Sequence, residues 1–285
     1  MLLSCVQSHV TFADLPDNLR RAEAWLQKAV SESVDLVVLP ECMLTGYGFE
    51  SRQEALTQAI SADDPAWQSL IAICRDSGRL HVVIGFLERE GDGDQTQLYN
   101  ATALIGPAGL LATYRKVHLP HLGVDRFVDR GNRPYAVHRA GEARVGLAIC
   151  YDCSFPEPMR VLGLAGADII ALSTNWPVAA ARTAEIVPAA RSMENHLFFV
   201  AANRVGSERG FRYCGSSSIS APDGVELARA GADDEQMLLA EVDVAQARNK
   251  RIERTPGAHV IDRFADRQPD FYSSVVARVH SGSAR

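Results

Sequence analysis

Short apolar runs alternate with helical patterns along this chain, and the same order occurs in both halves. Each half reads as strand, helix, strand and then a hairpin that turns at a Pro-x-Gly sequence. This alternation is typical of a layered α/β domain. It predicts two sheets related by an approximate two-fold axis, each with helices on one outer face, and it puts Glu41 and Cys150 at equivalent strand ends. The predicted strands are 35–39, 81–87, 101–105, 144–149, 168–172, 197–202 and 217–220, and the predicted helices are 17–31, 64–76, 156–163 and 181–195.

The composition narrows the class of protein. The 285 residues are 47% hydrophobic, which is enough for a large core, and we expect a single domain over residues 1–280 with a small, polar tail at 281–285. The net charge of -6 comes without basic runs and predicts neither a nucleic-acid nor a membrane partner. No apolar stretch approaches about 20 residues, so the chain should be soluble. We interpret Met1–Cys5 as the first buried strand, because it lacks the features of a signal sequence.

Six cysteines are too few for a disulfide scaffold in a chain of this length, which favours reduced thiols and a cytoplasmic location. Three apolar runs end in reactive side chains: a carboxylate at Glu41, an amine at Lys116 and a thiol at Cys150. Base, cation and nucleophile are the groups that attack on a carbonyl requires. A cysteine enzyme of acyl transfer is therefore the leading hypothesis.

Other interpretations of these residues stay open at this point. Cys150 could be an inert packed thiol, or Cys150-x-x-Cys153 could be a redox motif or half of a zinc site with His118 and His121. Glu41 could be a solvated carboxylate at a strand end, and Lys116 could lie on the surface. No Gly-x-Ser-x-Gly elbow and no phosphate-binding loop occurs, which disfavours serine hydrolases and nucleotide enzymes.

Taken together, these stretches resemble the nitrilase superfamily of carbon–nitrogen hydrolases over nearly the whole chain. Three motifs in the order and spacing of that family make the resemblance specific. The matching segments are Leu39-Pro40-Glu41 with Gly46-Tyr47, Tyr114-Arg115-Lys116-Val117-His118-Leu119, Cys150-Tyr151-Asp152 with Phe155-Pro156-Glu157, Asn175-Trp176-Pro177, and Ala202-Asn203-Arg204.

The resemblance implies a four-layer αββα sandwich of two mixed sheets that pairs through its αββα face into homodimers or larger homo-oligomers. It implies that Cys150 is the nucleophile, Glu41 the general base and Lys116 the oxyanion stabiliser, assisted by the Tyr151 backbone N–H. Neither a metal nor another cofactor is implied. The implied substrate-binding residues are Tyr47, Asn175 and Trp176.

Cys-Tyr-Asp resembles the amidase branches of the family, so the resemblance implies hydrolysis of a small amide. Many relatives carry a second glutamate between the lysine and the cysteine, close to a Pro-Gly pair. Here no glutamate occurs between Lys116 and Glu142, and Arg130-Gly131 stands where Pro-Gly is usual; Asp125 is the candidate replacement and Asp129 the second choice. The alternatives are an N-carbamoyl hydrolase, a nitrilase and a weakly active binding subunit. A carboxylate-binding clamp for the first of these would come from Arg126, Arg182 or Arg204.

Overall fold

The computed structural model describes residues 1–278 and divides the chain into two compact units, Met1–Arg248 and Asn249–Arg285. All of the predicted strands and helices belong to the first unit. The single domain over 1–280 stays a prediction, and the predicted tail at 281–285 lies outside the described residues.

Two six-stranded mixed sheets form the first unit within the described residues. In the first sheet, β1, β2 and β3 run parallel, and β4, β5 and β14 pair antiparallel at its two sides. Its strands, in spatial order, are β14 (Gln236–Glu241), β1 (Leu2–Gln7), β2 (Leu36–Val38), β3 (His81–Glu90), β4 (Gln97–Gly106) and β5 (Gly109–Arg115).

The second sheet repeats this arrangement. Here β7, β8 and β9 run parallel, and β6, β12 and β13 are the antiparallel strands. Its strands, in spatial order, are β13 (Glu226–Arg229), β12 (Ser218–Ser220), β9 (Phe198–Ala202), β8 (Ile169–Ser173), β7 (Ala143–Ile149) and β6 (Val137–Ala140). The short pair β10 (Ser207–Glu208) and β11 (Phe211–Arg212) stands apart from both sheets.

The internal two-fold is present, but the predicted equivalence of Glu41 and Cys150 is wrong. The order β14-β1-β2-β3-β4-β5 corresponds to β6-β7-β8-β9-β12-β13, so β1 matches β7 and β2 matches β8. Glu41 follows β2, whereas Cys150 follows β7. The prediction left the N-terminal strand out of the comparison, which shifted the match by one strand. The two residues therefore follow neighbouring, non-equivalent strand positions.

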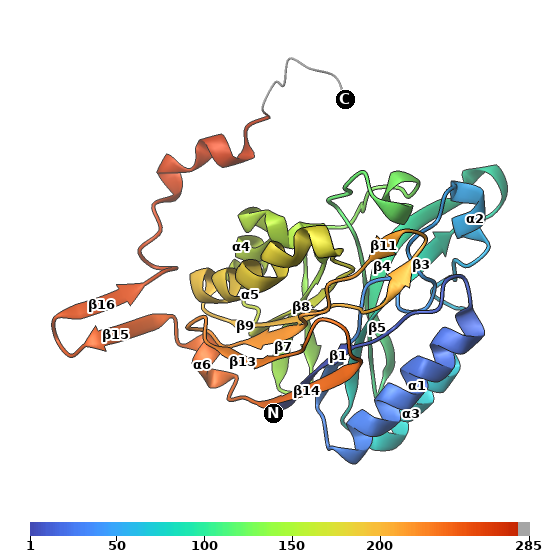
Figure 1. Ribbon diagram of the computed structural model, residues 1–285. Coiled ribbons are helices and arrows are strands. Elements are labelled where there is room, and N and C mark those ends of the chain that lie inside the picture. Colours follow the sequence, from blue (N-terminus) through green and yellow to red (C-terminus); the bar gives the residue numbers. More distant parts are fainter. Residues whose placement is uncertain (279–285) are drawn as a thin grey trace. The chain divides into compact units, whose positions relative to one another are not determined.

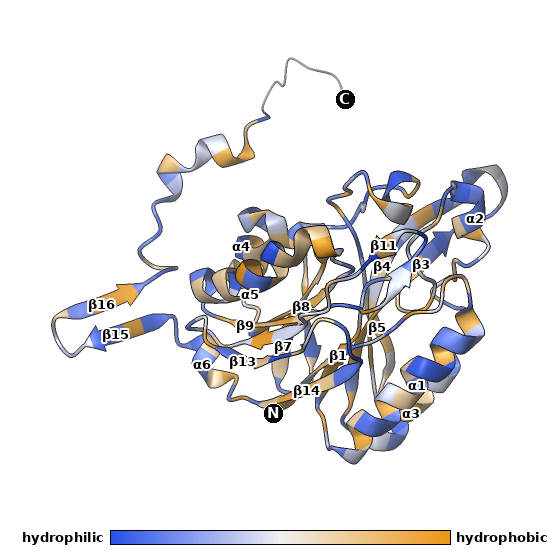
Figure 2. Cartoon of the chain, viewed as in Figure 1, coloured by the Kyte–Doolittle hydropathy of each residue, from blue (hydrophilic) through white to orange (hydrophobic). Residues whose placement is uncertain are grey.

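Helices cover the outer face of each sheet, which completes four layers (Figure 1). The apolar faces of α1 and α3 pack on the first sheet, and α4 and α5 belong to the core that both sheets share. Hydrophilic and hydrophobic residues alternate along α1, as one covered face requires (Figure 2). The helices are α1 (Leu15–Ser31), α2 (Arg52–Leu56), α3 (Trp67–Ser77), α4 (Pro156–Leu164), α5 (Ala181–Asn195) and α6 (Ala245–Arg248). The predicted αββα sandwich is confirmed.

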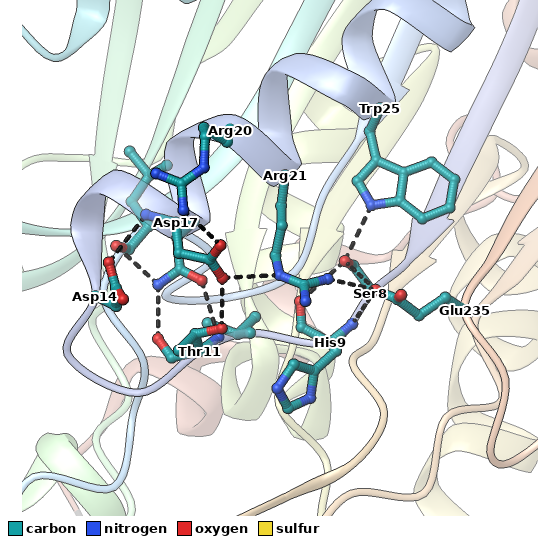
Figure 3. A network of polar contacts seen from close by, with 12 residues as sticks. Ser8, His9, Thr11, Asp14, Asp17, Arg20, Arg21, Trp25 and Glu235 are labelled. Carbon is teal, nitrogen blue, oxygen red and sulfur yellow. Dashed lines mark hydrogen bonds and ion pairs between the residues drawn. The ribbon is translucent and has the colours of Figure 1, made fainter.

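Polar contacts fix the first turn of α1 to the end of β1 (Figure 3). The Asp14 carboxylate accepts from the Asp17 N–H at 2.9 Å, and the Asp17 carboxylate accepts from the Thr11 hydroxyl at 2.7 Å. The first of these bonds satisfies an N–H group that has no acceptor within the helix. The Glu235 carboxylate, just before β14, accepts from the Ser8 hydroxyl at 2.9 Å. The loop after β1 is thereby tied to the start of α1 and to the segment before β14.

The second unit contains an antiparallel hairpin and two 3₁₀ turns. The hairpin pairs β15 (Arg251–Thr255) with β16 (His259–Asp262), and the turns are η5 (Pro269–Phe271) and η6 (Ser273–Val276). Phe271 and Val276 are 82% and 87% exposed. Across both units, no helix of residues 1–278 has the length and apolar character needed to cross a bilayer.

Candidate active site

Glu41 lies in a tight turn after β2 and is fully buried. The strand ends at Val38, three residues before Glu41, although Leu39 N–H still donates to Val83 O at 2.8 Å. The turn presses on β3 at Gly85: a Cβ at that position would lie 2.4 Å from the Cys42 nitrogen and 2.6 Å from the Glu41 Cα. Only glycine allows this approach. The Glu41 carboxylate therefore points into the protein and is not solvated.

Lys116 directly follows β5 and is also fully buried. Neighbouring side chains on an extended segment point to opposite sides, and this separates Lys116 from Arg115. The Arg115 guanidinium donates to the Glu88 carboxylate at 2.7 Å, away from the site. The Lys116 ammonium donates to Glu41 Oε1 at 2.6 Å. The surface interpretation of Lys116 is therefore excluded.

Asp125 completes an ion cluster with these two residues, whereas Asp129 lies elsewhere. Asp125 is in the 3₁₀ turn η2 (Gly123–Arg126), and its Oδ2 accepts from Lys116 Nζ at 2.5 Å. Asp129 instead forms an ion pair with Arg52 at 2.7 Å. Of the two candidates for the second acid, only Asp125 is next to the lysine.

Two further residues contact this cluster. Asn100 on β4 donates from its side-chain nitrogen to Glu41 Oε1 at 2.7 Å and to Asp125 Oδ1 at 2.8 Å. The Tyr47 hydroxyl donates to Asp125 Oδ2 at 2.8 Å, and its ring centroid is 5.9 Å from Lys116 Nζ. Asn100 was not predicted from the sequence. The only signal was its position on a strand next to the lysine strand, which many residues share.

Cys150 begins the 3₁₀ turn η3 (Cys150–Ser154), immediately after β7, and has a φ of 42°. Left-handed backbone at a residue other than glycine costs on the order of 1–3 kcal/mol and is found preferentially at functional sites. The Asp152 carboxylate holds this turn, because it accepts from the Ile149 N–H at 3.0 Å and the Tyr114 hydroxyl at 2.7 Å. His118 Nδ1 also lies 2.7 Å from Asp152.

The electrostatics of the cluster favour a neutral thiol next to a carboxyl group. Burial raises the pKa of Cys150 to about 12, the Glu41 charge adds to the increase, and Lys116 opposes it. Burial also raises the pKa of Glu41, against the lowering effect of the Lys116 charge. Burial lowers the pKa of Lys116, but the charges of Asp125 and Glu41 outweigh it and raise that pKa well above the ordinary value. The lysine is therefore a permanent cation, and the thiol requires a base to ionise it.

Several buried polar atoms around the thiol have no hydrogen-bond partner among the residues that the structure describes. The Thr174 side chain and the Asn175 backbone lie beside the Cys150 thiol, and both polar atoms of the Asn175 side chain are unpaired. Glu41 Oε2, in the cluster next to the thiol, is also unpaired. Unpaired buried polar groups cost free energy unless a ligand or water satisfies them. This set gives a bound polar molecule several contacts.

The remaining predicted residues have the following places. Trp176 is 3% exposed, and its backbone N–H donates to Asn203 Oδ1 at 2.9 Å. The Tyr151 side chain is 37% exposed and contacts Phe155 edge-on at 5.1 Å between ring centroids. Tyr151 is the second residue of η3, where backbone N–H groups have no acceptor within the turn.

The three arginines considered for a carboxylate clamp have other contacts. Arg204 is fully buried, and its guanidinium donates to Glu208 at 2.7 Å. Arg182 pairs with Glu185 on the exposed side of α5. The Arg126 guanidinium donates to backbone oxygens of Gly123 and Phe49. None of the bonds just given joins an arginine to the Glu41, Lys116 and Asp125 cluster.

Cys150 and Cys153 are free thiols. Within residues 1–278, no group of three or more His, Cys, Asp or Glu side chains is arranged to hold a metal ion. His118, which was considered as a ligand with the cysteines, is instead paired with Asp152.

Known proteins resemble this chain over nearly its full length. A nitrilase of Pyrococcus abyssi is 35% identical over 94% of this chain and 97% of its own. A 2-oxoglutaramate amidase of Bacillus subtilis is 29% identical, over 87% of this chain and 93% of its own. Among solved structures, an amidase of Nesterenkonia sp. AN1 has the same fold, with a TM-score of 0.79 at 24% identity over 97% of this chain and all of its own. The carbon–nitrogen hydrolase model matches residues 2–252. The chain therefore belongs to the carbon–nitrogen hydrolase family of the nitrilase superfamily.

Proposed function

We propose that this protein is an amidase that hydrolyses the C–N bond of a small amide through a thioester on Cys150. The observation that carries the proposal is the buried ion cluster beside the thiol: Lys116 Nζ lies 2.6 Å from Glu41 and 2.5 Å from Asp125. A base, a permanent cation and a protonated thiol in one buried site are suited to attack on an amide carbonyl.

The reaction begins when Glu41 accepts the Cys150 proton and the sulfur forms a bond to the carbonyl carbon. Negative charge develops on the carbonyl oxygen, and the Lys116 ammonium and the Tyr151 backbone N–H stabilise it. The C–N bond then breaks, and the leaving nitrogen takes the proton from Glu41. A water molecule gives its proton to the same carboxylate and attacks the thioester. The carboxylic acid leaves, and the sulfur regains its proton.

Asp125 supports the chemistry through Lys116 in this proposal. Its Oδ2 lies 2.5 Å from the ammonium, and its negative charge keeps the lysine protonated. The side chain is one methylene shorter than glutamate, and η2 carries it close enough for a direct contact. Asp125 therefore takes the place of the second glutamate of many relatives.

Substrate binding is assigned to Tyr47, Asn175 and Trp176. The Asn175 backbone lies beside the thiol, and the unpaired side-chain amide of this residue has both a donor and an acceptor, which suits a carboxamide group. The Tyr47 ring closes the site next to Lys116. Trp176 is assigned to an apolar wall, because it directly follows Asn175 and is almost completely buried.

Nitrile hydrolysis is the second candidate, because the relative from Pyrococcus abyssi is named a nitrilase. Cys150-Tyr151-Asp152 favours the amide, in keeping with the relative that is named an amidase. An N-carbamoyl substrate with a carboxylate is less well supported, since Arg204 is neutralised by Glu208. A weakly active binding subunit requires an impaired cluster, and the contacts of Glu41, Lys116 and Asp125 argue against it.

We further propose that the protein is a cytoplasmic homo-oligomer. The outer surface of α4 and α5 carries large apolar side chains, of which Val161, Leu164, Ile186 and Met193 are 43–46% exposed. Apolar residues gathered on one surface favour association with a second copy. All six cysteines are free, which agrees with a reducing compartment. Light scattering at several concentrations tests the oligomer, and a monomer at all of them would contradict it.

A screen for ammonia release from small amides, nitriles and N-carbamoyl amino acids tests the function. We expect amides to give the highest kcat/KM. Cys150→Ala should abolish turnover, whereas Cys153→Ala, in the same 3₁₀ turn, should retain most of it. Equal loss in both variants, with both folded, would refute Cys150 as the nucleophile. Release from nitriles alone would replace the amidase by a nitrilase.

A further inference from the structure

Asn100 contacts every charged member of the cluster, although it carries no charge. It is 1% exposed on β4, and its backbone carbonyl accepts from the Lys116 N–H at 2.8 Å. Its side-chain nitrogen donates to Glu41 Oε1 at 2.7 Å and to Asp125 Oδ1 at 2.8 Å. One residue therefore sets the strand position of the lysine and the orientation of both carboxylates.

The orientation of the Asn100 amide is determined by its neighbours. An amide nitrogen has two N–H donors, and both are used on carboxylate oxygens, which only accept when ionised. The amide oxygen faces the Cys42 thiol, whose sulfur lies 3.7 Å away. A flipped amide would place an oxygen against two carboxylates.

We propose that Asn100 is a positioning residue that holds Glu41 and Asp125 in one arrangement and leaves Glu41 Oε2 available for the Cys150 proton. Glu41 Oε1 is occupied by Asn100 and Lys116, while Oε2 has no partner among the described residues. The inference rests on the proposed function, in which Glu41 is the base.

The uncharged Asn100 amide can donate hydrogen bonds to two carboxylates without changing the net charge of the cluster. Two carboxylates face a single ammonium, and like charges in a buried site raise the pKa of a carboxyl group. Asn100 donates to both carboxylates without adding charge, which lowers the pKa of Glu41 against burial and the Asp125 charge. The titratable groups that face Glu41 are Lys116, Asp125, Cys42, Tyr47, Cys150 and Tyr213.

Two variants of similar volume test the inference. Asn100→Leu removes both donors, and Asn100→Asp adds a third carboxylate. Since the free base must be ionised, kcat/KM falls on the acid side of its pH profile. A hydrogen bond to a charged group contributes a free energy that corresponds to about one pKa unit. We therefore expect the midpoint on the acid side of the kcat/KM profile to move upward by about 1 pH unit in Asn100→Leu. This is about a tenfold loss at a fixed pH below the midpoint. The shift should be larger in Asn100→Asp.

A second measurement does not depend on any substrate. The rate at which iodoacetamide alkylates Cys150, followed by mass spectrometry of its peptide, rises with pH as the thiol and Glu41 lose their shared proton. Its midpoint should move upward in both variants. Thr102→Val is the matched control: Thr102 is buried two residues along on the same side of β4, and its hydroxyl lies 3.3 Å from Ser173. This control should keep both midpoints.

The outcomes separate the two proposals. If the wild-type chain hydrolyses none of the amides in the screen, the proposed function fails, and the alkylation midpoints still decide the role of Asn100. If the wild type is active but folded Asn100 variants lose rate with unchanged midpoints, the inference is overturned, because a merely structural role explains that result. Should Asn100→Leu fail to fold, Asn100→Asp, which keeps the shape of asparagine, supplies the answer.

Discussion

Replacing Lys116 by methionine tests the electrostatic core of the site, because methionine preserves the length and removes the charge. The substitution breaks contacts of 2.6 Å to Glu41 and 2.5 Å to Asp125 in a fully buried place. Loss of one oxyanion donor lowers kcat by about 10²–10³-fold, which is about 2.7–4 kcal/mol. We expect a loss of this size in kcat and a smaller change in KM.

The same variant should be less stable, and by an amount that depends on pH. Removing one partner of a buried ion pair costs about 3–5 kcal/mol in the free energy of unfolding. Without the ammonium, burial raises the pKa of the Glu41 carboxyl further in the folded state. A folded carboxyl with a raised pKa binds more protons than the unfolded one, so stability falls as pH rises through the raised pKa. The destabilisation should therefore be larger at pH 8 than at pH 6.

Steady-state kinetics with the best amide and urea unfolding at both pH values measure these effects. Lys28→Met is the matched control, since Lys28 is exposed on α1, and it should leave kcat unchanged. Lys116→Arg should not restore turnover, because the planar guanidinium is larger and its charge is spread out. Near-normal kcat in the arginine variant, or equal destabilisation of Lys116→Met at both pH values, would refute the reasoning.

Three further predictions follow from the site. Prolonged treatment with a chelator should leave kcat unchanged, and restoration of a lost rate by zinc would contradict the proposed chemistry. Because burial raises the pKa of Glu41, kcat/KM should fall on the acid side of its pH profile, with a midpoint above the ordinary range of glutamate. Glu41→Gln should abolish turnover at every pH. If that variant kept activity with the same fall at acid pH, the fall would belong to another group. Gly131→Ala should lower both stability and kcat, since its Cβ would lie 2.1 Å from the Arg115 carbonyl oxygen, next to Lys116. A Cβ at Gly231 would lie in open space, so the control Gly231→Ala should change neither stability nor kcat. Equal thermal unfolding temperatures for the two variants would contradict the predicted clash at Gly131.

Local patterns were enough to predict most of the fold. The helix 181–195 was predicted with the bounds that α5 has, and the strand at 144–149 differs from β7 by one residue. Apolar periodicity and turn residues act over short distances in the sequence, so they can be recognised without coordinates. The motifs around Glu41, Lys116 and Cys150 were likewise evident, because each combines a reactive residue with the end of an apolar run.

Only the tertiary structure decided how these pieces meet. The equivalence of β2 and β8 in the internal two-fold follows from the order of the strands in the two sheets, and local sequence patterns do not specify that order. Lys116 and Arg115 are both buried, but they contact different partners because their side chains point to opposite sides. Asp125, and not Asp129, contacts Lys116 because of the direction in which that loop turns. Asn100 reaches Glu41 across 59 residues of sequence and Asp125 across 25. Such contacts arise when the sheet brings distant segments together, and no periodicity in the sequence marks them.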